Sequence, residues 1–342
     1  MNAFSSLLAS LPAAHGGYLG QTIALAVAVS WTVCALLSET VSRRLGAHVV
    51  NVLRMVLSLL FIGALLWVCT GSPLPPRADA TTWGWLLASG AVGYVFGDYC
   101  LFNAYLLIGS RFGQLFMTLA PAVSALAGWL LLGERLSPQA LAGMAVTTTG
   151  IAVSILGRGA PDADETGRGS RRRVRLNLPA RGVLLGIGAG VGQGLGLTLS
   201  AVGLHHYAAD WAHGAAATAP AAAEHLRWLL PFAATQMRAV AGLPGFLLIL
   251  LWAGKGGALR RACTDGRGWL LMAATVVFGP FVGVSLSLMA TQYTSTGVAM
   301  TIMSLSPVLI LWPAHVLFGQ RVTRREVLGA LISVAGVALF FV

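Results

Sequence analysis

The chain has 342 residues, of which 56% are hydrophobic and only 10% are charged, and its mean hydropathy is +0.78. This composition excludes an ordinary water-soluble globule. The formal charge of +11 would suit a nucleic-acid-binding protein. However, the basic residues lie mainly in short loops beside apolar runs, as the positive-inside rule describes for membrane proteins. We therefore expect the lipid bilayer, and no nucleic acid, as a partner.

Ten apolar runs of about 20 residues follow one another along the chain, and this is the length that an α-helix needs to cross a bilayer. They span residues 19–38, 47–70, 83–107, 111–133, 138–157, 182–204, 228–253, 268–292, 295–318 and 324–342. The pattern predicts an all-α integral membrane protein with ten transmembrane helices. The first 18 residues contain no Lys or Arg, so we expect helix 19–38 to be retained rather than cleaved as a signal peptide.

Loop charge predicts the orientation of these helices. Ten crossings put both termini on one side, and only Arg77, Arg135 and Arg227 fall in the loops of that side. The loops of the opposite side hold 17 Lys and Arg residues. Since Lys and Arg accumulate in cytoplasmic loops, the opposite side is predicted to be cytoplasmic and both termini to lie outside the cell (inner) membrane.

The most polar segment, residues 158–181, carries seven arginines and divides the chain nearly in half. It is predicted to be a solvated cytoplasmic linker that faces anionic lipid headgroups. A regulatory or nucleic-acid role is the alternative for such an arginine run.

The two halves of the chain resemble each other. Shifting the sequence by 186 positions aligns the stretch that begins at Leu119 with the stretch that begins at Leu305, and it matches glycine, proline and arginine residues that are costly to match by chance. The organisation is therefore predicted to be a first unit at 19–157 and a second at 182–342. Because each unit has an odd number of helices, the second enters from the opposite face, which gives an inverted repeat with a central site near the midplane.

Each copy carries a proline inside an apolar run, Pro121 in the first and Pro307 in the second. A proline in a helix interior removes one donor and frees the carbonyl four residues earlier. The freed carbonyls would belong to Met117 and Met303 and would face a cavity, or the prolines only produce packing kinks.

The stretch from Phe96 to Ile155 resembles the repeat unit of the EamA family within the drug/metabolite transporter superfamily. It has a Gly-Asp entry at Asp98, a proline in the following helix, a Gly-Glu-Arg turn at Glu134 and a glycine-spaced last helix. The second copy is similar but has Gln320 in place of the glutamate and Val284 in place of Asp98. The resemblance implies a ten-helix carrier that moves small metabolites outward, and it implies cytoplasmic termini, opposite to the loop-charge prediction.

Charged residues inside the bilayer are candidates for function. Asp98 and Arg54 lie at similar depths below the same face, roughly 15 and 10 Å at ~1.5 Å per residue, so they are predicted to form an ion pair. The alternative is that Asp98 binds a proton or another coupling ion. Arg238 is the counterpart of Arg54 but has no matching carboxylate. It is expected either to snorkel to the surface or to attract an anionic group of the substrate.

Aligning the first helix of each unit sets Trp31 opposite Gln193, an aromatic platform facing an amide, which would suit a zwitterionic or aromatic substrate. Packing is the alternative role of Trp31. Weaker polar candidates for the cavity are Asn103, Tyr94 and Gln292.

The segment from His205 to His225 holds four histidines, but its spacing provides no compact set of metal ligands. We expect no metal and no cofactor, and we expect this segment to form an extracytoplasmic linker or lid. The chain has no nucleotide-binding or hydrolase motif in a fitting context. A secondary transporter, an exporter of amino acids or drug-like compounds, is therefore the leading hypothesis. An intramembrane lipid-acting enzyme and a non-transporting sensor or scaffold are the alternatives.

Overall fold

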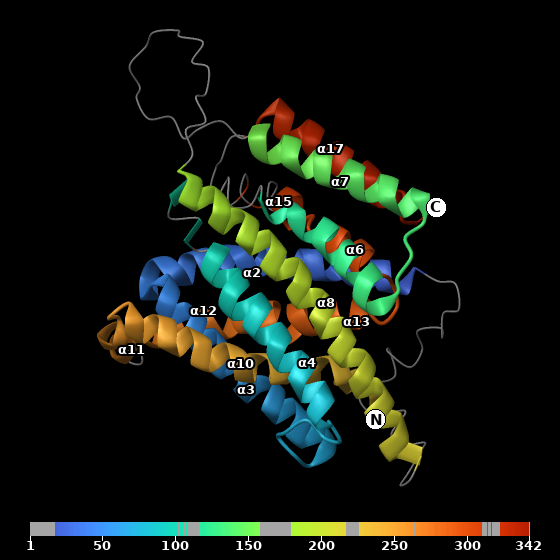
Figure 1. Ribbon diagram of the computed structural model, residues 1–342. Coiled ribbons are helices and arrows are strands. Elements are labelled where there is room, and N and C mark those ends of the chain that lie inside the picture. Colours follow the sequence, from blue (N-terminus) through green and yellow to red (C-terminus); the bar gives the residue numbers. More distant parts are fainter. Residues whose placement is uncertain are drawn as a thin grey trace.

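A computed structural model of the protein describes residues 18–341 except 102, 105–106, 109–115, 158–178, 217–225, 263–264, 310–312, 314–315 and 317–321. The described residues form helices and no strands, so the all-α prediction is confirmed for this part of the chain (Figure 1). The predicted linker 158–181 lies almost wholly outside the described residues.

The first half contains α2 (Leu19–Leu45), α3 (Ala47–Thr70), α4 (Ala80–Gly90), η1 (Ala91–Asp98), α6 (Leu119–Leu132) and α7 (Pro138–Gly157). The second half contains α8 (Ala180–Ala216), η2 (Arg227–Leu229), α10 (Leu230–Trp252), α11 (Gly256–Ala262), α12 (Gly266–Val276), η3 (Val277–Val284), α13 (Ser285–Ala290), α14 (Thr296–Met303), α15 (Ser306–Leu309) and α17 (Arg324–Ala338).

Within the described residues, five helical segments are long and apolar enough to cross a membrane. They are Leu19–Ser42, His48–Thr70, Ala180–Ala212, Arg227–Trp252 and Gly266–Ala290, and Leu119–Leu132 is a shorter apolar helix. Each coincides with one of the predicted runs, with bounds that differ by a few residues at most ends. The predicted runs 111–133 and 295–318 are broken, because turns at Thr118 and at Ser304–Leu305 interrupt them.

Two aspartates begin corresponding helices of the two halves. The Asp79 carboxylate accepts the Thr82 amide at 2.6 Å and caps α4, and the Asp265 carboxylate accepts the Gly268 amide at 3.1 Å and caps α12. These N-caps satisfy amides that have no partner within the helix. The two aspartates are 186 positions apart, which is the offset that aligns the sequence repeat.

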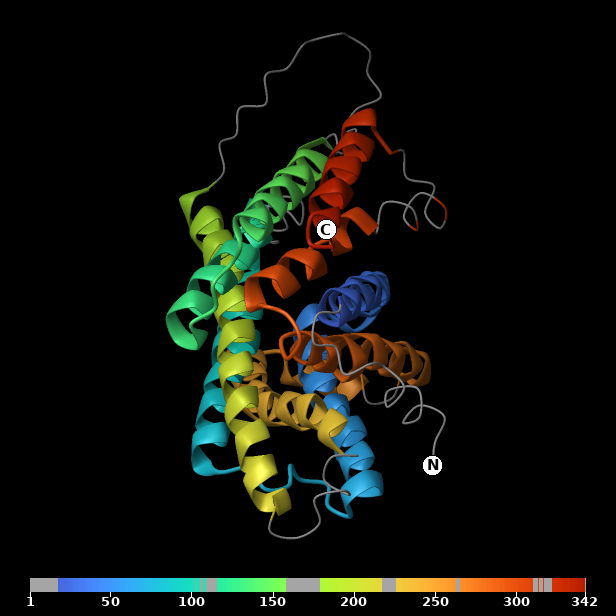
Figure 2. The same cartoon turned by 90° about the vertical axis from the view of Figure 1, so that its right-hand side faces the viewer.

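The first helix of each half packs against the other half. The helix α2 lies along α12, η3, α13 and α14, whereas the long α8 lies along α4, η1 and α6 (Figures 1 and 2). The two halves therefore exchange their first helices, and neither half forms a separate core.

The last helices of the halves, α7 and α17, pack side by side at the edge of the molecule (Figure 1). A side chain at Gly150 would lie 2.7 Å from the Gly329 carbonyl oxygen, so glycine is required for this approach. One turn along, the Thr147 and Ser333 hydroxyls each donate to the other residue's carbonyl at 3.4 Å. Because higher numbers in α7 meet lower numbers in α17, the two helices run antiparallel.

The helix α8 is longer than its sequence predicts. It continues through the segment predicted to be a lid, up to Ala216, and residues 217–225 lie outside the described residues. The cause is twofold. The alanine-rich sequence has high helix propensity, and Tyr207 is fully buried, with its hydroxyl donating to the Pro76 carbonyl at 2.9 Å.

Candidate functional site

The site centres on η1, a π-helical segment that follows α4 without interruption. A π-helix holds more residues per turn than an α-helix, and such segments occur frequently at functional sites. In η1 the wider turn carries Tyr94 and Asp98, which are both buried, at 7% and 8% exposure. Both were among the sequence candidates.

A seam of glycines brings α8 against η1. Side chains at Gly192 and Gly196 would lie 2.7 and 2.6 Å from backbone atoms of η1, so these glycines permit the contact. The close approach lets the Gln193 amide reach Asp98, where Nε2 donates to Oδ1 at 2.7 Å, and it also donates to the Gly93 carbonyl at 3.3 Å.

The predicted ion pair between α3 and η1 is present. Arg54 Nη2 donates to Asp98 Oδ2 at 2.6 Å, and the side chains are 20% and 11% exposed. Arg54 also lies 6.0 Å from the centroid of the Phe246 ring, on α10. Asp98 therefore has one oxygen on a guanidinium and the other on an amide, which satisfies both of its carboxylate oxygens.

Arg238 of α10 points inward and does not snorkel. Its residue is 5% exposed, and its guanidinium carbon lies 4.6 Å from the centroid of the Tyr94 ring. Its depth is about 12 Å from the Leu230 end of α10 at ~1.5 Å per residue. The aromatic face attracts the cation, but it supplies no hydrogen-bond acceptor to Nε.

Unpartnered polar atoms gather around these side chains. Arg54 Nε, Arg238 Nε, the Tyr94 hydroxyl and the Ser58 hydroxyl are buried and have no hydrogen-bond partner among the described residues. Ser58 lies one turn after Arg54 on α3. Two guanidinium groups against the single carboxylate of Asp98 leave this cluster with one excess positive charge. A buried cation without a counter-ion is costly in a membrane, so the cluster is suited to receive an anionic group.

The second half repeats the shape of the site without its charge. The π-helix η3 occupies the positions of η1 plus 186, and Val284 stands where Asp98 stands in the first half. A side chain at Gly283 would meet the Trp31 indole, as a side chain at Gly97 would meet the Gln193 amide. Trp31 and Gln193 therefore hold equivalent places, each against the π-helix of the opposite half. Aligned positions are related by symmetry rather than by proximity, so Trp31 packs on η3 and Gln193 packs on η1.

Of the three weaker polar candidates, Tyr94 belongs to this cluster, whereas Asn103 and Gln292 have other surroundings. The Asn103 amide donates to the Tyr99 carbonyl one turn earlier, at 2.8 Å. Gln292 lies in the turn between α13 and α14, rather than within a spanning helix. Neither Asn103 nor Gln292 has a described hydrogen bond to Asp98 or Arg238.

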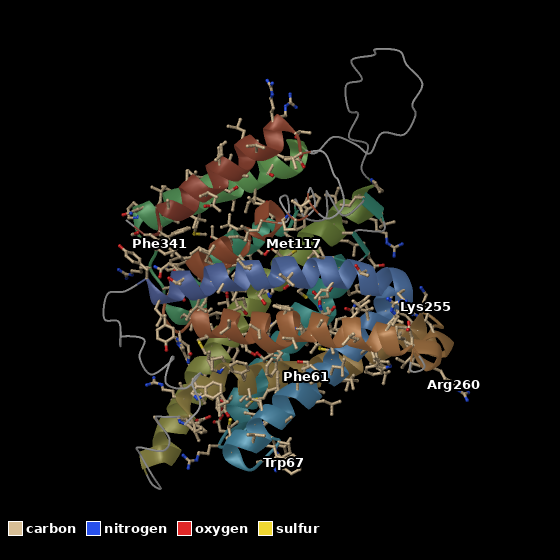
Figure 3. All side chains as sticks on the ribbon, turned by 180° about the vertical axis from the view of Figure 1, so that it is seen from behind. Phe61, Trp67, Met117, Lys255, Arg260 and Phe341 are labelled. Carbon is tan, nitrogen blue, oxygen red and sulfur yellow. The ribbon has the colours of Figure 1, made fainter. Side chains whose placement is uncertain are left out.

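The prolines begin helical segments instead of kinking helix interiors. Pro121 is the third residue of α6 and Pro307 the second of α15, each after a turn. Proline is tolerated in the first turn because its missing donor would have had no partner there. The carbonyl of the buried Met303 accepts the Ser306 hydroxyl at 3.1 Å, so it already has one donor within the chain. Met117 is half-buried, just before the break (Figure 3).

One contact was not anticipated from the sequence. The Glu134 carboxylate accepts the Thr296 amide at 3.0 and 2.9 Å and the Thr296 hydroxyl at 2.8 Å. It thereby caps α14, a helix of the other half. The Gly-Glu-Arg turn marked this glutamate as notable, but no local pattern indicates a partner 162 positions away.

No group of three or more potential metal ligands occurs in the part of the chain that the structure describes. His225 and the end of the histidine-containing segment lie outside that part, and His205 and His206 are exposed on α8.

Comparison with known proteins agrees with this architecture. The model of the EamA-like transporter family matches residues 18–156 and 211–342. No curated protein matches the chain. One solved structure, described only as "Crystal structure of protein", superimposes with a TM-score of 0.59 at 17% identity, covering 94% of this chain and 96% of that chain. This likeness concerns the fold alone. Together with the apolar helices, the family match identifies an integral multi-pass membrane protein, and the chain belongs to the EamA-like transporter family.

Proposed function

We propose that the protein is a secondary transporter that exports small metabolites, such as amino acids or drug-like compounds, by alternating access. The observation that carries this proposal is the buried polar cluster of Arg54, Tyr94, Asp98, Gln193 and Arg238 at the meeting of four apolar helices. Helices that only form a scaffold have no need to hold an uncompensated charge within the bilayer. The family match favours transport over a lipid-acting enzyme and over a sensor.

We propose further that ten helices form two inverted five-helix units, residues 19–157 and 182–342, joined by the cytoplasmic linker 158–181 in the inner membrane, with both termini outside. Three observations support the inversion: the helix caps and the π-helices recur at an offset of 186 positions, and α7 runs antiparallel to α17. Inverted units place a substrate site at their interface and open it alternately to each side.

Arg238 is the proposed recognition group for a negatively charged part of the substrate. Its guanidinium presents several donors in a plane, which suits a carboxylate better than a point charge does. The ring face of Tyr94 holds the guanidinium. The unpartnered hydroxyls of Tyr94, and of Ser58 on α3, are further donors in the buried part of the protein. Binding of an anion would cancel the excess charge of the cluster.

Asp98 is the proposed point of coupling. In the described arrangement it is engaged by Arg54 and Gln193. Because the cluster has only one carboxylate for two guanidinium groups, a substrate anion that approaches Arg54 would compete with Asp98. Protonation of the released carboxylate, or its binding of another cation, would link substrate movement to an ion gradient.

The test is untargeted metabolite analysis of the medium of cells that produce the intact protein, Arg238→Ala, Arg238→Lys or Arg267→Ala at equal membrane abundance. Arg267 is an exposed arginine in the first turn of α12 and serves as the control. We expect the same anionic or zwitterionic compounds to accumulate with the intact protein and with Arg267→Ala, at reduced levels with Arg238→Lys, and at background levels with Arg238→Ala.

Two results would contradict the proposal. Equal media from producing cells and from cells with an empty vector, across growth conditions, would contradict export. Undiminished accumulation with Arg238→Ala would contradict the role of Arg238. Thermal unfolding of each purified variant separates a loss of binding from a loss of the fold.

A further inference from the structure

A second feature lies away from the polar cluster, at the end of the molecule that carries α11. A cavity of 380 Å³ opens between the turn that joins α2 to α3 and the turn that joins α10 to α11. Its lining includes Leu45, His48, Val49, Lys255 and Gly257. None of these residues belongs to the proposed transport site.

Backbone geometry creates this space. Gly46 and Gly254 have φ angles of +85° and +66°, a region that favours glycine. Each allows its connection between helices to turn sharply at the rim of the cavity. Side chains at Gly46, Gly254 and Gly257 would meet no atom within 4 Å. The space in front of each of these three glycines is therefore open.

The chemistry of the lining is basic on one side and apolar on the other. The exposed Lys255 ammonium has no carboxylate within ion-pair distance among the described residues, and the half-buried His48 lies beside it. Arg260 extends from the same end of the molecule on α11 (Figure 3). Leu45 and Val49 supply the apolar wall. The matching ligand carries a compact anion joined to hydrocarbon.

The position of the cavity identifies the medium from which such a ligand comes. Its walls are the places where α2 ends, α3 begins and α10 ends, so it lies at the level where the apolar helices leave the bilayer. Just beside it, Trp252 and Leu251 are 85% and 58% exposed. Tryptophan is enriched at the membrane–water interface, and these two apolar side chains offer a surface for acyl chains.

We propose that this cavity binds the phosphate group of an anionic membrane lipid, with Lys255 and His48 at the phosphate and the acyl chains along Trp252. Clusters of basic residues at this level of the bilayer attract anionic headgroups. This cavity shares no residue with the transport site, so binding of lipid here does not depend on the proposed function.

The test uses the full-length protein in nanodiscs of phosphatidylcholine, titrated with phosphatidylglycerol and followed by native mass spectrometry. Lys255→Gln removes the cation, Gly257→Leu fills the cavity without changing charge, and Arg260→Gln removes an equal charge from outside the lining. We expect Lys255→Gln to weaken binding of phosphatidylglycerol about fivefold, the factor that corresponds to the roughly 1 kcal/mol typical of one basic residue near the surface. Gly257→Leu should weaken it at least as much, and Arg260→Gln by less than twofold.

Four results would overturn the proposal. Equal losses for Lys255→Gln and Arg260→Gln would indicate a general basic surface. Unchanged binding in Gly257→Leu would place the lipid outside the cavity. Equal binding of phosphatidylcholine would remove the role of the anion. Displacement of the lipid by millimolar inorganic phosphate alone would assign the site to a free phosphate compound.

Discussion

Removing the carboxylate of Asp98 should destabilise the protein, and removing the whole ion pair should cost less than the sum of its two halves. In Asp98→Asn, Arg54 loses its charged partner while its side chain stays four-fifths buried. Breaking a buried ion pair from one side costs about 3–5 kcal/mol, and an arginine at the centre of a spanning helix costs about 2.5–3.5 kcal/mol. The new amide oxygen still accepts one hydrogen bond, so we expect a loss near the lower end, about 3 kcal/mol in the free energy of unfolding.

The matched variant is Arg54→Gln, which should cost a similar amount because it leaves Asp98 with only the Gln193 amide. The double variant Arg54→Gln/Asp98→Asn removes both charges of the pair, so neither partner is left without the other. We expect it to cost at least 2 kcal/mol less than the sum of the single variants, since neighbouring charges couple by roughly 0.5–3 kcal/mol. Reversible unfolding by sodium dodecyl sulfate in mixed micelles measures all three losses.

Additive costs in this cycle would refute the reasoning, because they would mean that the two charges are compensated independently. The exposed pair of Arg44 and Asp265, with side chains 45% and 21% exposed, provides the reference. Arg44→Gln should change stability much less than Arg54→Gln, since solvent screens surface pairs. Equal effects at both sites would also contradict the buried character of the Asp98 pair.

Glu134→Gln should lower the free energy of unfolding by about 1–2 kcal/mol, because charge-assisted hydrogen bonds to the start of α14 become neutral ones; an unchanged unfolding midpoint would contradict this role. Gly150→Ala should lower the free energy of unfolding by about 1–3 kcal/mol, because its side chain would collide with the backbone of α17. In Gly84→Ala the new side chain meets open space, so the change should be neutral or stabilising by up to about 1 kcal/mol. Equal thermal unfolding midpoints for the two variants would refute this packing. Hydrogen bonds from Arg44 lower the pKa of Asp265 from 3.8 to about 2. The ionised Asp265 therefore stabilises the protein fully above pH 4, and this stabilisation is lost as the pH falls towards 2. Unfolding midpoints should drop less over that interval in Arg44→Gln than in the intact protein, and identical drops would contradict the pairing.

The depths of Arg54 and Asp98 in the bilayer, counted along their apolar runs, were enough to predict their ion pair. Both residues are charges in apolar runs that enter from the same face, and a charge within a bilayer requires a partner. The π-helices could not be predicted in this way. A π-helix differs from an α-helix in closing its hydrogen bonds over five residues instead of four. This leaves the hydropathy of the sequence unchanged, so nothing in the run that contains Tyr94 distinguishes the two.

The surroundings of Gln193 show a second boundary of prediction. Aligning the two halves indicates that Gln193 and Trp31 are equivalent, but equivalence under a two-fold relation does not make two residues neighbours. Their contacts depend on the exchange of α2 and α8 between the halves. That exchange is a tertiary property which periodicity within one helix does not encode. For the same reason the partner of Glu134 could not be read from its turn.

The exchange of first helices also determines when α2 can reach its packing partners during synthesis of the protein. The helix α2 ends at Leu45, and its packing partners begin at Gly266, about 220 residues later. At roughly 5–20 residues per second, α2 spends about 10 to 45 seconds in the membrane before those partners exist. During that interval its glycine-facing and serine-bearing surface is covered by lipid or by another protein. The first half therefore reaches its final packing only while the last quarter of the chain, from Gly266 onward, is being made.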